Sequence, residues 1–210
     1  MLYAGPGRPQ LHLVTDDRLP RARLLTAVRA AAENGADWVQ VRDHRAPARD
    51  LYALAHAAIA LCRPLGVRVA VNDRLDVALA VRADGAQVGG RGLPVGVARS
   101  VVGSLRLGVS VHGMGDALQA QAEGADWVTL GHIFSTSSHP DQPPRGVAAI
   151  RQIAGAVQVP VIAIGGIDAG RVAAVLAAGA GGVAVISAIL DTPHPGHATA
   201  ALRAALDRLA

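Results

Sequence analysis

The sequence predicts an α/β protein in which eight βα units close into a (β/α)8, or TIM, barrel. Three observations predict this fold. Short apolar runs recur along the 210 residues, and several of them end in glycine or polar residues. Alanine-rich stretches long enough for crossover helices separate these runs. The joint between helix and strand also repeats, as in 33–39 (ENGADWV) and 123–128 (EGADWV).

Each element follows from these joints. We expect strands at 11–14, 38–42, 67–71, 85–88, 107–111, 127–131, 160–164 and 182–186. We expect helices at 21–34, 46–62, 74–82, 94–102, 114–123, 145–156, 169–178 and 197–209. The whole chain, 1–210, is interpreted as one domain with its core at about 11–190. An open doubly wound sheet is the competing fold, but no Gly-x-Gly-x-x-Gly follows the first strand.

Composition excludes several classes of function. An aromatic content of 2% leaves few rings for stacking bases, and the arginines are scattered, so no nucleic-acid partner is expected. All 20 basic residues are arginine, which removes lysine Schiff-base chemistry. Cys62 is the single cysteine and cannot form an intrachain disulfide. The chain lacks a long uncharged apolar run, so we expect a cytoplasmic protein without membrane contact.

Polar residues at the predicted strand ends should converge on one pocket. Arg42 could bind a substrate carboxylate or phosphate, and Asn72 offers a neutral donor and acceptor. Asp73 is the pocket carboxylate best placed to hold a metal. His132 and Thr136, in the region of the polar loop 135–144, are candidate substrate contacts.

The ends of the last two strands suggest a phosphate site built from main-chain amides. Gly165 and Gly166 follow one strand, and Ile186 and Ser187 follow the other. This fold usually binds phosphate there, and glycines allow a close backbone approach. A small phosphorylated molecule is therefore the expected partner. His112 ends the fifth strand, where an imidazole could act as an acid and base near neutral pH.

At these residues the chain resembles the superfamily of thiamine phosphate synthase and the thiazole tautomerase TenI, from Leu11 to about Leu190. The matching segments are 13–16 (LVTD), 39–42 (VQVR), 71–74 (VNDR), 83–85 (ADG), 131–134 (GHIF), 164–167 (IGGI) and 183–187 (VAVIS). Members often form dimers, so the resemblance also implies a homodimer.

The superfamily contains two activities, and the resemblance to the tautomerase is the stronger. The synthase pattern has a lysine, an aspartate and a second lysine where this chain has His44, Gly92 and His139. The tautomerase pattern matches Ser110-Val111-His112 and 131–136 (GHIFST). We therefore expect an isomerase that aromatises a thiazole carboxylate phosphate through His112 without a metal. The alternatives are the Mg²⁺-dependent synthase, with Asp73 as metal ligand, and a catalytically silent barrel that binds thiazole or thiamine phosphates.

Overall fold

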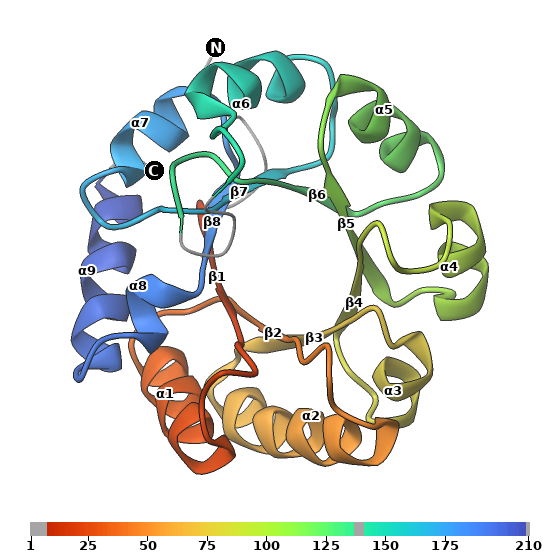
Figure 1. Cartoon of the computed structure of the whole chain (residues 1–210), viewed down its shortest axis with the longest axis vertical. Coiled ribbons are helices and arrows are strands. Elements are labelled where there is room, and N and C mark those ends of the chain that lie inside the picture. The colour runs from red at the N-terminus through yellow and green to blue at the C-terminus, as the bar shows by residue number, and fades with distance from the viewer. Residues whose placement is uncertain (1–7, 137–140, 209–210) are drawn as a thin grey trace.

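The computed structural model describes residues 8–136 and 141–208 and shows a closed barrel of eight parallel strands surrounded by helices (Figure 1). The predicted (β/α)8 fold is confirmed. The strands are β1 (Gln10–Val14), β2 (Trp38–Val41), β3 (Arg68–Asn72), β4 (Gly85–Val88), β5 (Arg106–Val111), β6 (Trp127–Leu130), β7 (Val161–Ile164) and β8 (Gly182–Val185). Each strand pairs with the next in sequence, and β8 pairs with β1, so the competing open sheet is wrong.

The helices follow the strands in turn. They are α1 (Arg21–Glu33), α2 (Ala48–Cys62), α3 (Leu75–Ala80), α4 (Val95–Val102), α5 (Met114–Ala122), α6 (Gly146–Ala154), α7 (Val172–Ala177), α8 (Ser187–Leu190) and α9 (Pro195–Asp207), with a 3-10 turn η1 (Arg63–Leu65) after α2. The short helix α8 was not predicted. None of the helices within the described residues is long and apolar enough to cross a bilayer.

The strands are buried on both faces, which explains why they read as nearly continuous apolar runs. In β1, Leu11 and Leu13 belong to the main core between the barrel and its helices. His12 and Val14 alternate with them and face the barrel interior, where Val14 packs in a separate small cluster. The same alternation decides which residues at each strand end can reach the centre of the barrel.

The N-terminal end of the barrel interior is filled by rings. The imidazole of His12 stacks on Trp38 at 5.8 Å between ring centroids and meets Trp127 edge-on at 6.0 Å. A Cβ at Gly108 would lie 2.2 Å from Trp127, so glycine there makes room for the indole. These side chains close the bottom of the barrel and confine open space to its opposite, C-terminal end.

Candidate active site

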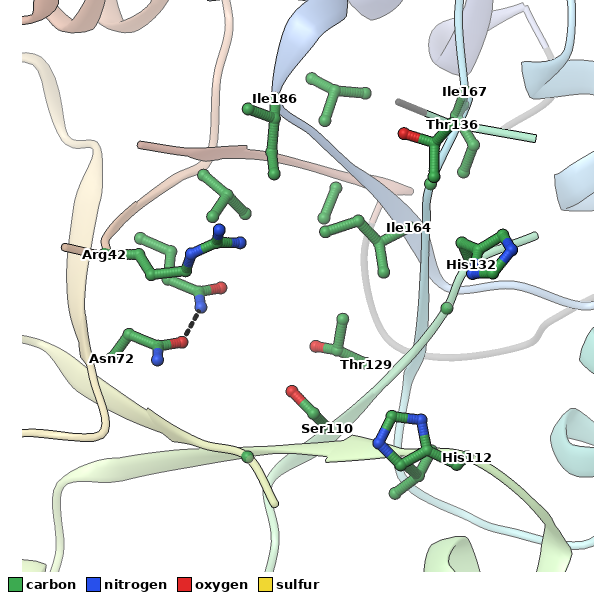
Figure 2. Close-up of a pocket in the computed structure, with 18 of the residues that line it drawn as sticks. Arg42, Asn72, Ser110, His112, Thr129, His132, Thr136, Ile164, Ile167 and Ile186 are labelled. Atoms are coloured by element: carbon green, nitrogen blue, oxygen red, sulfur yellow. Dashed lines mark hydrogen bonds between the residues drawn. The ribbon is translucent and has the colours of Figure 1, made fainter. Parts of the chain in front are cut away.

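A cavity of about 440 Å³ lies at the C-terminal end of the barrel, within the range of small-molecule sites (Figure 2). It contains every residue that the sequence singled out for the site. These are Arg42, Asn72, Asp73, His112, His132, Thr136, Gly165, Gly166, Ile186 and Ser187. Arg42 and Asn72 lie on one side of the cavity, and His132 and Thr136 lie across from them (Figure 2).

One wall is a chain of hydrogen bonds that connects β2 to β3. The side-chain amide of Gln40 donates to Asn72 Oδ1 at 2.5 Å, and Asn72 Nδ2 donates to Asp73 Oδ2 at 2.8 Å. The backbone N–H of Gly89 donates to Asp73 Oδ1 at 3.0 Å. Asp73 has a left-handed backbone with φ of 59°, which Asp and Asn tolerate better than most residues. These bonds fix the carboxylate at the edge of the cavity.

A second polar chain inside the barrel was missed by the sequence analysis. Gln87 is fully buried and donates to Ser110 Oγ at 3.0 Å, and Thr129 Oγ1 donates weakly to Gln87 Oε1 at 3.5 Å. The signal was available, because Gln87 and Thr129 are polar residues at inward-facing positions of otherwise apolar strands. Their bonds orient the Ser110 hydroxyl, which lines the cavity.

The two predicted histidines have different surroundings. His112 is exposed on the cavity wall, and its backbone N–H donates to Asp116 Oδ2 at 2.9 Å. His132 is buried, and its Nε2 donates to the carbonyl oxygen of Gln142 at 3.1 Å. His132 is therefore held by the polar loop, His112 is exposed, and both line the cavity. His139 lies outside the described residues.

The expected phosphate side of the cavity is lined by backbone from the ends of β7 and β8. Gly165 and Gly166 have φ of 99° and 63°, and a Cβ at Gly165 would lie 2.3 Å from His132 Cβ. These glycines thus bring two loops together, as well as lining the cavity. Ser187 opens α8, and the first N–H groups of a helix have no partners within it. This arrangement can hold a phosphate group.

Positive charge dominates the cavity wall. Arg42, Arg91 and Arg145 line it, whereas Asp73 is the one carboxylate among the described lining residues. His44 lies on the same rim, where burial and then the nearby Arg42 and Arg91 lower the pKa of its imidazole. The cavity therefore has the electrostatics expected for a polyanionic ligand.

Asp73 is the candidate metal ligand of the site. Among the described residues, no group of three His, Cys, Asp or Glu side chains is arranged for a metal ion. Mg²⁺ often uses only one or two carboxylates and completes its shell with substrate phosphates and water. One fixed carboxylate beside a cationic cavity fits a Mg²⁺ ion that arrives with a phosphorylated substrate.

Comparisons of sequence with known proteins identify one family. A family profile described as "Thiamine monophosphate synthase" matches residues 11–189. The chain is 47% identical to a "Thiamine-phosphate synthase" of Methanoculleus marisnigri, covering 95% of each chain. It is 46% identical to a protein of the same name from Roseiflexus castenholzii, over 93% of this chain and 87% of that one. A solved thiamine phosphate pyrophosphorylase from Pyrococcus furiosus superposes with a TM-score of 0.88 at 37% identity, covering 95% and 96%.

The expectation of a metal-independent isomerase of the tautomerase type is wrong. The relatives with 45–47% identity along almost the whole chain are named synthases. That expectation rested on three single positions, His44, Gly92 and His139, where the charged residues of the synthase pattern are replaced. In space, Arg91 and Arg145 also line the cavity, so those three positions alone underestimate its positive charge.

Proposed function

The chain belongs to the thiamine monophosphate synthase family, and from this premise we propose that it joins a pyrimidine diphosphate to a thiazole phosphate. The observation that carries the proposal is the similarity along nearly the whole chain to proteins named thiamine-phosphate synthase. The cavity supports it, because Arg42 and the backbone at the ends of β7 and β8 offer separate candidate sites for the two phosphorylated groups.

The reaction forms one bond and breaks one. A carbon–nitrogen bond forms between the thiazole nitrogen and the methylene carbon of the pyrimidine, while the carbon–oxygen bond to the diphosphate breaks. The electron pair leaves with the diphosphate, which departs as an anion. Groups that stabilise negative charge on the leaving oxygens therefore accelerate the reaction most.

Each site residue has a proposed role in this reaction. Arg42 and Asn72 bind the diphosphate, and Asp73 would hold a Mg²⁺ ion that neutralises charge on it. The backbone at Gly165, Gly166, Ile186 and Ser187 binds the phosphate of the thiazole. His112, His132 and Thr136 contact the substrates from the wall between these two groups (Figure 2).

The proposed condensation gives His112 a different role from the one expected for a tautomerase. No proton moves between carbon atoms in this reaction, so the acid and base role expected for the tautomerase has no step here. We propose that His112 serves as a polar contact on the wall, supported by its exposed ring at the end of β5.

The test is to incubate the purified protein with both substrates and Mg²⁺. We expect thiamine phosphate, detected by mass spectrometry, and an equal amount of released diphosphate. Omitting either substrate should abolish both signals, and chelation of Mg²⁺ should slow them. Thermal stabilisation by the substrates without any product would instead identify a barrel that binds these compounds and does not join them.

A further inference from the structure

Because the chain has no lysine, the positive charge that binds a diphosphate must come from arginine side chains. Resting on the function proposed above, we propose that Arg91, in the loop after β4, is a binding residue for the diphosphate group. Its guanidinium replaces part of the positive charge that the synthase pattern supplies through lysine. Arg91 was not among the residues that the sequence analysis assigned to the site.

The loop that carries Arg91 is fixed beside the metal-binding candidate. The N–H of Gly92 donates to the carbonyl of Gly89 at 2.9 Å, which closes a tight turn around residues 90 and 91. Gly89 N–H in turn donates to Asp73 Oδ1 at 3.0 Å. The turn is thereby tied to the carboxylate on the cavity edge, and Arg91 lines the same cavity.

Residue 92, next to Arg91, lies against the carboxylate of Asp73. A Cβ at Gly92 would lie 3.1 Å from Asp73 Oδ1, so a side chain there would begin against this carboxylate. The synthase pattern places a second aspartate at this position, next to the first. Glycine here leaves one carboxylate in the loop region, and the neighbouring arginine makes the local charge more positive.

The surroundings of Arg91 show that its charge is available to a ligand. Ion pairs involve Arg8, Arg18, Arg45, Arg74, Arg99, Arg106, Arg171 and Arg203. Arg91 makes no hydrogen bond or ion pair within residues 8–136 and 141–208, and neither does the guanidinium of Arg42. Arg42, His44 and Arg91 line the same cavity, and after burial these two arginines are the groups that lower the pKa of the His44 imidazole. A guanidinium group can bind a phosphate oxygen pair through parallel hydrogen bonds.

The experiment measures binding of inorganic pyrophosphate by calorimetry, first with a chelator present and then with Mg²⁺. The parent protein should bind pyrophosphate under both conditions. The R91M variant should lose about tenfold in affinity, corresponding to one hydrogen bond to a charged group at a solvent-accessible site. R91K should bind more tightly than R91M and less tightly than the parent, because it keeps the charge but loses the parallel hydrogen bonds. R151M, which removes an exposed arginine of α6 outside the cavity, is the matched control and should bind as the parent does.

The outcomes separate this inference from the proposed function. Equal pyrophosphate binding by R91M and the parent would overturn the assignment, and so would R91K falling as far as R91M. If the parent forms no thiamine phosphate while R91M still loses pyrophosphate affinity, the proposed function fails and the assignment of Arg91 stands. In the active enzyme, R91M should raise KM for the pyrimidine diphosphate and leave KM for the thiazole phosphate unchanged. Circular dichroism of each variant verifies the fold.

Discussion

Replacing Asp73 with asparagine should weaken both the fold and the reaction. Asparagine tolerates the left-handed backbone at this position, so the change tests the charge and not the conformation. Its carbonyl oxygen can still accept the N–H of Gly89, but its NH2 group then faces the donor Nδ2 of Asn72. Asn72 cannot rotate its amide without losing the bond that Gln40 donates to Asn72 Oδ1. One hydrogen bond to a charged acceptor is lost, and two donors are left in opposition.

The magnitude follows from these contacts. A hydrogen bond to a charged group contributes about 1.5–3 kcal/mol. Asp73 is partly exposed, so we expect a loss of about 2 kcal/mol in the free energy of unfolding, measured by urea denaturation. In a chain of this size that corresponds to a fall in Tm of about 4–8 °C. The synthase rate should fall more than about tenfold, and a higher Mg²⁺ concentration should be needed for half-maximal rate, because a carboxylate ligand is removed.

Asp76→Asn is the matched control for Asp73→Asn. Asp76 also accepts two hydrogen bonds, both from Arg74, but its side chain is exposed. Its replacement should change stability by less than about 1 kcal/mol and leave the Mg²⁺ dependence of the rate as in the parent. Asp73 lacks the proposed roles if Asp73→Asn is as stable as Asp76→Asn, or if its rate shows the Mg²⁺ dependence of the parent.

Three further predictions, one with a control substitution, test the packing and charges of the barrel. Burial lowers the pKa of His12 to about 3 in the folded protein. Below about pH 6.5 the unfolded chain therefore binds a proton on this ring that the folded protein does not, and stability falls as the pH drops. His12→Phe should remove roughly 2 kcal/mol of that fall between pH 7 and 5 in urea titrations; an unchanged slope contradicts it. Gly165→Ala should cost about 2–4 kcal/mol and raise KM for the thiazole phosphate, because its Cβ would meet His132. Gly66→Ala, also at positive φ but in open space, should cost only about 1 kcal/mol, and equal losses would exclude the steric cause. Arg203→Met should cost about 2–3 kcal/mol by urea denaturation, because it removes the buried cation beside Asp37, which among the described residues keeps only the exposed Arg8 as an ion-pair partner, and the donor to the Pro9 carbonyl; a loss under 1 kcal/mol would contradict this.

Local patterns were sufficient to predict the elements and their order. Apolar runs bounded by small residues identified all eight strands, since a strand covered on both faces must be apolar at nearly every position. The short helix α8 escaped because a four-residue helix has no periodicity to detect. The site residues were predicted by their position at strand ends, because parallel strands in a barrel all point the same way.

The same reasoning was less successful for charge and for buried polar groups. Gln87 and Thr129 lie within strands, and only polar residues at strand ends were predicted to belong to the site. Arg91 and Arg145 follow different strands, 54 positions apart, and no sequence spacing relates them. Comparing single positions with a family pattern therefore suggested a loss of charge that the cavity as a whole does not show.

The sequence by itself determined the succession of strands and helices and the polar character of one end of the barrel, because both depend on contacts between near neighbours in the chain. Tertiary structure decided which side chains meet across that end. Closure of β8 onto β1 brings loops from the whole chain around one cavity, so its charge and hydrogen bonding depend on distances in space that cannot be read from the local order of residues.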